Sequence, residues 1–272
     1  MNLTEGKALW LKWWETIRIT WTREMAYKLN FFLLIIGPTV VFFFIKYNLW
    51  STIYSDDPSR VLSGFDFPTM IAYQSWVMIV SFLAQGYHSI NLAEDIRLGR
   101  ISAYLIYPFQ FWQFHMASFI AFQGIQLLVA AFSFGCLVAG GLLPVPSAET
   151  LLAGILLCWL VGFVWFGIHY CIGLMAFWLD ETWVLRVIMN TVAQFVSGAL
   201  IPLEFFPGWF QEAAMFTPFP WMTWAPVQVF MGTYSGSILQ AFAVLGLWLV
   251  AFLGAGRWIF SRGLRMYTAA GM

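Results

Sequence analysis

The sequence predicts an all-α polytopic membrane protein with six transmembrane helices, an N-terminal amphipathic interfacial helix, and a broken or re-entrant segment between spans five and six. Of the 272 residues, 61% are hydrophobic and only 10% are charged, whereas soluble domains carry about 25% charged residues. Apolar runs of about 20 residues, long enough to cross a bilayer, recur along the chain. Five of the 11 prolines fall between residues 202 and 226, where no single straight helix can continue.

Residues 1–28 are expected to form an amphipathic helix in the headgroup region of the membrane. Its apolar side chains are spaced by 4, 3, 4 and 4 residues, which places them on one helical face: Trp10, Trp14, Ile17, Trp21 and Met25. Four cations lie largely off that face, namely Lys7, Lys12, Arg18 and Arg23. Tryptophan rings and cationic side chains both favour the membrane interface. A soluble helix packed on another domain is the alternative.

Six apolar segments follow within a membrane domain at 29–265, before a short cytoplasmic tail at 266–272. The predicted spans are 30–49, 69–91, 112–143, 151–179, 187–203 and 236–260. An even number of spans puts both termini on the same side of the membrane.

The distribution of cations predicts that this side is the cytoplasm. With the N-terminus inside, the inner regions hold 11 of the 13 lysines and arginines, and only Lys46 and Arg60 lie outside or near the outer interface. An excess of cations in cytoplasmic loops is typical of membrane proteins.

The connection between spans two and three, from about Asn91 to Trp112, is unusual because it mixes charges with a short helical stretch. Its polar residues and glycine are followed by a stretch that ends at Pro108; they are Glu94, Asp95, Arg97, Gly99 and Arg100. We expect a surface helix available to a cytoplasmic partner, with an ordinary solvated loop as the alternative.

The proline-rich region at 202–232 remains apolar and aromatic. This composition favours short broken or re-entrant helices buried near the outer leaflet over a plain extracellular loop.

The sequence contains no recognisable catalytic or metal-binding motif. Gly6 and Lys7 are followed by alanine without an upstream glycine, so the chain has no P-loop of its own. The three cysteines form no C-x-x-C motif. Two facing histidines among His88, His115 and His169 could hold a haem, so a haem- or quinone-binding membrane anchor remains an alternative.

Uncharged polar residues lie within several predicted spans. Asn190, Gln194 and Ser197 are spaced by 4 and 3 residues and share a helix face, which should turn away from lipid. Hydrogen bonds within the bundle and a substrate route both explain this pattern. The candidates for lining a pathway or a contact between permeases are Gln74, Gln85, Asn190, Gln194, Ser197 and Glu204.

The two unusual connections resemble those of the permease subunit of ABC-2 type ATP-binding cassette exporters, in the bacterial branch with six spans. Residues 94–108, EDIRLGRISAYLIYP, are similar to the family's Ile-Arg-x-Gly stretch followed by Leu-x-x-Pro. Residues 197–209, SGALIPLEFFPGW, with Pro218 and Pro220, are similar to its Ser-Gly and Phe-Pro elements. The N-terminal helix resembles the family's elbow helix.

This resemblance implies a transport protein without catalytic residues that works as a dimer of permeases, with an identical or a different second chain. The loop at 92–111 would carry the coupling helix, which docks on a separate P-loop ATPase that binds ATP and Mg²⁺. The residues implied in that contact are Glu94, Asp95, Arg97, Gly99, Arg100 and Tyr104. Spans two and five would line the export pathway in the bacterial inner membrane. A stand-alone channel or secondary carrier is the alternative.

Overall fold

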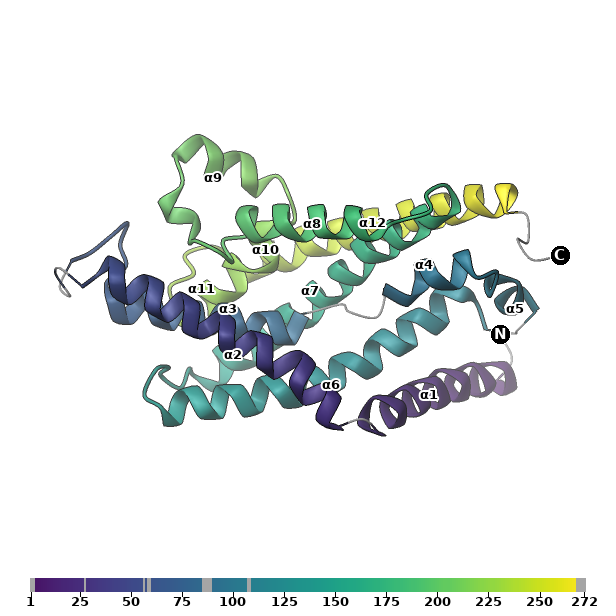
Figure 1. The fold of residues 1–272 in the computed structure, drawn as a ribbon, viewed down its shortest axis with the longest axis horizontal. Coiled ribbons are helices and arrows are strands. Elements are labelled where there is room, and N and C mark those ends of the chain that lie inside the picture. Colours follow the sequence, from purple (N-terminus) through teal and green to yellow (C-terminus); the bar gives the residue numbers. More distant parts are fainter. Residues whose placement is uncertain are drawn as a thin grey trace.

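The computed structural model describes residues 3–26, 28–55, 57, 60–84, 90–106 and 109–267. Within these ranges the chain is all-α and contains no β-strand (Figure 1). The helices are α1 (Leu3–Ala26), α2 (Lys28–Ile53), α3 (Phe67–Ala84), α4 (Ile90–Arg97), α5 (Ile101–Ile106), α6 (Phe111–Ala139), α7 (Ala148–Leu174), α8 (Trp183–Val196), α9 (Gly208–Met215), α10 (Phe219–Met222), α11 (Trp224–Met231) and α12 (Ile238–Met266). Two short 3₁₀ turns are Met175–Phe177 and Leu203–Phe205.

Each of the six predicted spans contains a helix. Four helices in the described part of the chain are long and apolar enough to cross a membrane: α3, α6, α7 with its 3₁₀ extension, and α12. The chain is therefore a multi-pass membrane protein. The fifth predicted span, 187–203, is shorter in the structure, because α8 has 14 residues and ends before Gly198, whose φ of +78° breaks the helix.

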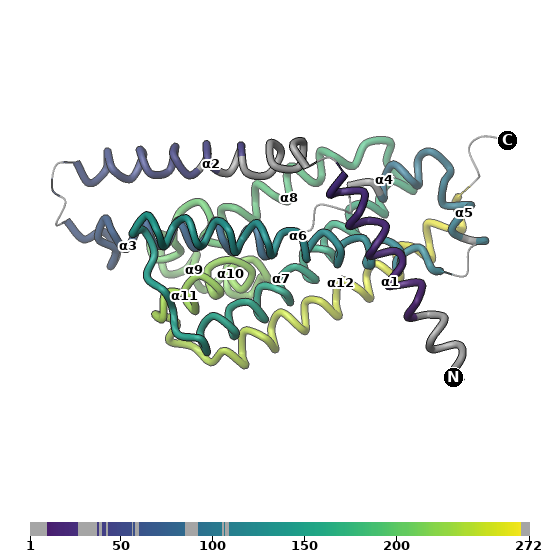
Figure 2. The backbone as a smooth tube through the Cα atoms, turned by 90° about the horizontal axis from the view of Figure 1, so that it is seen from below, coloured from purple at the N-terminus to yellow at the C-terminus, as the bar shows by residue number. Residues whose placement is uncertain are grey.

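The helices form an elongated bundle with two distinct ends. Helix α1, the pair α4 and α5, and the end of α12 lie towards one end (Figures 1 and 2). The connections from α2 to α3 and from α6 to α7 lie at the opposite end, with α9 and α11 nearer to it. This arrangement separates the two connections that the sequence singles out.

Helix α7 runs through the middle of the bundle and is packed closely against its neighbours. Leu157, Val161, Val164 and Leu174 are fully buried along it. A Cβ atom added at Gly154 would overlap the Phe230 ring of α11, which in turn stacks on Trp76 of α3 with a centroid distance of 4.5 Å. Small residues of this kind let membrane helices approach closely.

Helix α1 packs along α6, with an inward face that differs in part from the predicted one. Trp13 contacts the ring of Trp112 (centroid distance 6.3 Å), and the hydroxyls of Thr20 and Ser118 are hydrogen-bonded at 3.3 Å. The predicted stripe is divided, because Trp21 and Met25 pack on the core whereas Trp10 and Trp14 stack on each other and are 64% and 51% exposed. Because tryptophans lie on both sides of α1, their spacing alone does not identify the face that packs on the bundle.

The region after α8 is divided among short helices. Pro207 and Pro218 stand at the N-caps of α9 and α10, where the missing N–H costs nothing. Almost all of α10 and α11 is buried against α7 and its neighbours, whereas Trp209 and Phe216 at the ends of α9 are exposed.

Candidate functional site

The charged connection between α3 and α6 folds into two short helices, α4 and α5, that meet at a tight turn. Gly99 lies in this turn with a φ of +72°, a left-handed conformation that glycine adopts without strain. The Leu98 N–H donates to the Glu94 carbonyl (2.9 Å), and the Gly99 N–H donates to the Ile96 carbonyl (3.2 Å). Where the sequence indicated one short helical stretch, the structure has two short helices joined by a tight turn, which together are called the α4–α5 hairpin below.

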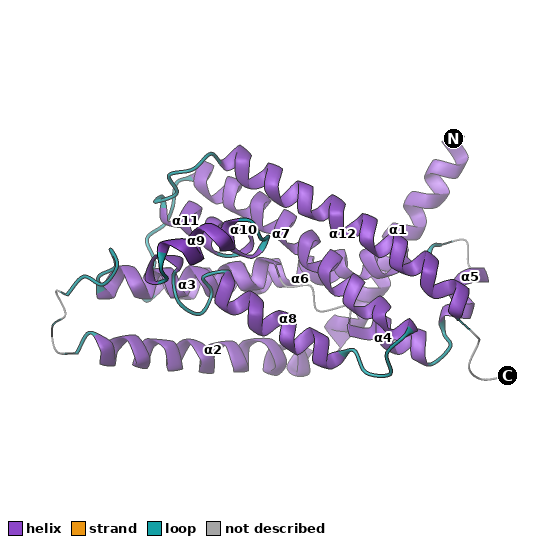
Figure 3. Cartoon of the chain, turned by 90° about the horizontal axis from the view of Figure 1, so that it is seen from above, coloured by secondary structure: helices purple, strands orange, loops and turns teal. Residues whose placement is uncertain are grey.

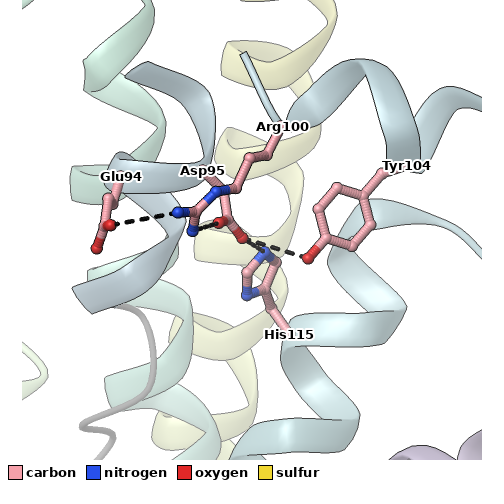
Figure 4. Close-up of polar contacts among 5 residues, drawn as sticks. All are labelled: Glu94, Asp95, Arg100, Tyr104 and His115. Carbon is pink, nitrogen blue, oxygen red and sulfur yellow. Dashed lines mark hydrogen bonds and ion pairs between the residues drawn. The ribbon is translucent and has the colours of Figure 1, made fainter. Parts of the chain in front are cut away.

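Asp95 is the polar centre of this hairpin (Figure 4). It is only 7% exposed. Arg100 donates from Nη1 to Oδ1 (3.3 Å), and the Tyr104 hydroxyl donates to Oδ2 (3.3 Å). Nε2 of His115, in the first turns of α6, lies 3.6 Å from Oδ2. Asp95 therefore ties α4 to the turn, to α5 and to α6.

Burial is the main cause of the pKa shifts of Asp95 and Tyr104 in this cluster. It raises the pKa of the Asp95 carboxyl above its usual range, although the hydrogen bonds from Arg100 and Tyr104 partly oppose the shift. Burial also raises the pKa of the Tyr104 hydroxyl, and the neighbouring Asp95 raises it further. Tyr104 is accordingly a neutral donor at physiological pH.

The other charged members of the hairpin face outward. Glu94 and Arg100 form an exposed ion pair at 3.7 Å. Arg97 pairs with Glu181, in the connection between α7 and α8, at 3.1 Å. The three predicted contact residues Glu94, Arg97 and Arg100 are thus accessible, whereas Asp95 is held inside the chain.

The opposite side of the hairpin is anchored in an apolar core. Leu92 and Ile101 are completely buried and Ile96 nearly so, packed with side chains of α6 and α7. Gly173 of α7 allows Leu92 to approach so closely that a Cβ atom at that position would lie 2.6 Å from a Leu92 methyl group. The hairpin is therefore attached directly to α6 and α7.

The predicted pathway residues are not gathered in one place. Asn190 and Gln194 are exposed on α8, although Asn190 also contacts His169 of α7. Ser197 is buried at the C-cap of α8. Gln85 lies outside the described residues.

Of the remaining two candidates, Gln74 lies in a buried polar contact and Glu204 in a partly buried one. Glu204 accepts hydrogen bonds through Oε1 from Trp224 Nε1 (2.8 Å) and Gln228 Nε2 (2.9 Å). Gln74 accepts one from Lys46, which the sequence predicts to lie outside or near the outer interface. The Lys46 side chain is only 7% exposed. The sequence feature that could have indicated this buried contact is the position of Lys46 as a single cation inside the predicted span 30–49.

The sequence model described as ABC-2 family transporter protein matches residues 36–271. The chain belongs to the ABC-2 transporter family. No curated protein and no solved structure matched it. Members of this family are membrane components of transporters that normally work with an ATP-binding subunit, so the resemblance noted in the sequence is confirmed.

Two of the three histidines of this ABC-2 chain lie in described helices, and these helices differ. His115 is in α6 and His169 is in α7, where its Nδ1 is 3.0 Å from the Trp165 carbonyl. His88 lies outside the described residues. Among the residues that were described, no group of three or more His, Cys, Asp or Glu side chains could hold a metal ion.

Proposed function

We propose that this chain is a permease subunit of a bacterial ABC exporter, that it forms the substrate pathway with a second permease, and that separate ATPase subunits drive it. It would cross the inner membrane six times, with both termini in the cytoplasm. Membership of the ABC-2 family and a helix at each predicted span support this proposal. Helix α1, which carries cations along its length, and the cation-rich end of α12 lie towards the same end of the bundle as α4 and α5, which agrees with the excess of cations expected inside.

The observation that carries the proposal is the two-sided construction of the α4–α5 hairpin. Its outer side presents Glu94, Arg97 and Arg100 to solvent, and its inner side is locked into α6 and α7 through Leu92 and Ile101. This is what a coupling element needs, namely a polar surface for a soluble ATPase and a rigid attachment to the membrane helices. ATP and Mg²⁺ would bind to that partner.

Helix α8 is proposed to face the second permease. Ala193 is the one fully buried residue among the 14 of this helix, and Asn190 and Gln194 are exposed beside apolar neighbours such as Val187 and Phe195. Figure 3 shows α8 on the surface of the bundle. Polar side chains facing lipid are costly, so a protein partner or a pathway is the more favourable environment.

The segment 202–232 is proposed to be re-entrant near the outer leaflet. Irregular backbone is tolerated at membrane depth where it is buried in protein. The burial of α10 and α11 and the bonds that Trp224 and Gln228 donate to Glu204 support such a position.

Affinity purification of the chain from its native cells in mild detergent, followed by mass spectrometry, tests the proposal. We expect a soluble P-loop ATPase in an amount comparable to the permease, with or without a second six-span chain. A chain that purifies alone and transports in vesicles without ATPase would instead be a stand-alone channel or carrier. A Soret band in the purified protein would indicate a haem-binding anchor.

A further inference from the structure

The chain leaves α8 through a sharp turn whose carbonyl groups accept hydrogen bonds from distant helices. The Ser197 carbonyl accepts from the backbone N–H of Trp224, the first residue of α11 (3.1 Å). The Gly198 carbonyl accepts from the Tyr73 hydroxyl of α3 (2.8 Å). A helix end leaves carbonyls without partners in the helix, and here α11 and α3 provide donors for two carbonyls of the turn that follows.

Lys46 of α2 makes the third contact with this turn. Its Nζ donates to the Ala199 carbonyl (2.6 Å) and to Oε1 of Gln74 in α3 (2.5 Å). Three consecutive carbonyls, those of residues 197–199, are thus held by three different helices. Lys46 therefore joins α2 to both α3 and the turn, because its one ammonium group bonds Gln74 and Ala199.

The burial of Lys46 is costly for the fold. Its side chain is 7% exposed in a helix whose exposed positions include Ile45 and Leu49. An ammonium group loses its hydration shell on burial, and the loss is offset only where hydrogen bonds replace the water. A methionine would fill a similar space without this cost. The presence of lysine therefore points to a role for the bond to Ala199 beyond packing.

Helix α8 has few other attachments that would fix its position. Ala193 is its one fully buried residue. At its other end, the ion pair of Arg97 with Glu181 is about half exposed, and such pairs contribute little. The turn at residues 197–199, together with the contact of Asn190 with His169 of α7, therefore attaches α8 to the rest of the chain.

We propose that Lys46 is a positioning residue of the transport cycle, which clamps the outer turn of α8 to α2 and α3. The proposal rests on the proposed function, in which α8 faces the second permease. While the ammonium holds the Ala199 carbonyl, the outer end of α8 cannot separate from α2. Opening of the pathway at this end requires the bond to break, so the clamp sets the distance between α2 and α8 in the closed state.

The test measures the distance between α2 and α8 in the complete permease–ATPase complex in lipid nanodiscs. Cys136, Cys158 and Cys171 are replaced by alanine, and spin labels are attached at Thr52→Cys in α2 and Thr191→Cys in α8, both exposed positions. Labelled chains are diluted into unlabelled ones. Double electron–electron resonance is recorded without nucleotide and after trapping with ATP and vanadate. With Lys46 present we expect a narrow distribution that shifts on trapping.

Lys46→Met should broaden the nucleotide-free distribution and abolish its shift on trapping, because the bond that ties the Ala199 carbonyl to α2 is then lost. Lys46→Arg restores a donor and should restore both features. Ile45→Met, at an exposed position next to Lys46, is the matched control and should change neither. A Lys46→Met distribution as narrow as that of the unaltered chain would overturn the proposal.

Should Lys46→Met fail to fold, Gln74→Leu provides the second test, since it removes the acceptor that orients the ammonium. It too should broaden the distribution, and an unchanged width would overturn the clamp. An ATPase that does not co-purify would overturn the proposed function instead. The nucleotide-free widths in the permease alone would then still decide whether Lys46 holds α8.

Discussion

Arg97, the last residue of α4, forms an ion pair with Glu181, which lies two residues before α8 begins (Nη1 to Oε1, 3.1 Å). This pair connects the proposed coupling hairpin to the helix proposed to face the second permease. Both side chains are about half exposed, at 49% and 55%. The pair can therefore exchange partners, and Arg97 remains available to an ATPase that docks on the hairpin.

Replacing both Glu94 and Arg97 with alanine should weaken capture of the ATPase without unfolding the permease. Exposed ion pairs contribute about 0 to 1 kcal/mol to stability, so the thermal unfolding of the isolated permease should change little. Arg60→Ala, at an exposed position in the connection between α2 and α3, is the matched control. Equal amounts of ATPase recovered with the double variant and the control would contradict the coupling role.

Asp95→Ala should destabilise the hairpin itself. The substitution leaves Arg100, Tyr104 and the nearby His115 without their shared carboxylate. Loss of a partner by buried polar groups costs about 1 to 3 kcal/mol. The neighbouring Glu94→Ala, at an exposed site, should change the unfolding free energy by no more than about 0.5 kcal/mol. Thermal unfolding in detergent compares the two, and equal effects would refute the internal role of Asp95.

The raised pKa of Asp95 predicts the sign of a pH effect on stability. The folded state binds this proton more tightly than the unfolded chain, where aspartate has a pKa of about 3.9. The contribution of Asp95 to stability is thus fully present below that value and is lost as the pH rises through the folded pKa.

The difference in unfolding free energy between the protein that keeps Asp95 and the protein with Asp95→Asn should therefore decrease from pH 4 towards pH 7. Asparagine does not titrate, so the difference isolates the carboxyl group. Both proteins should carry His115→Gln, which removes the titration of the histidine that faces Asp95. A difference that grows with pH would mean that the ion pair with Arg100 outweighs burial.

Some features of the α4–α5 hairpin can be predicted from its sequence and others cannot. The mixed charges and Gly99 predicted a surface element at 92–111, because charged residues indicate solvent exposure and glycine indicates a turn, and both are local properties. The exposure of Glu94 and the burial of Asp95 could not be predicted, since the position of α6 decides which of the two carboxylates is buried. The same holds for Trp13 and Trp14 on α1.

Lys46 illustrates a stronger limit on prediction from sequence. A single cation near the end of an apolar run normally reaches the interface by extending its side chain. Its acceptor Ala199 is 153 positions away in the chain, beyond a helix whose end was predicted a few residues too late. Pairings over such distances depend on the packing of the whole bundle.

Gly99→Ala should strain the hairpin turn, because a side chain at a φ of +72° is unfavourable by about 1 to 2 kcal/mol. Gly99→Asn should be milder, since asparagine tolerates the left-handed region better than other residues. ATPase capture and thermal unfolding should both follow the order glycine, asparagine, alanine. Alanine and asparagine variants with identical properties would show that the turn relaxes without cost.

Gly154→Ala tests whether close packing at the centre of α7 supports the bundle. The added methyl group would overlap the Phe230 ring, which cannot withdraw easily because it stacks on Trp76. Overpacking of this kind typically costs about 1 to 3 kcal/mol. Gly246→Ala in α12 is the matched control, since a Cβ atom there meets nothing within 4 Å. Alanine is favoured over glycine inside a helix by up to about 1 kcal/mol, so the control should unfold at the same or a higher temperature. If Gly154→Ala were as stable as the control, Phe230 would have to move, and the stacking of α11 on α3 through Trp76 could not be a rigid part of the fold.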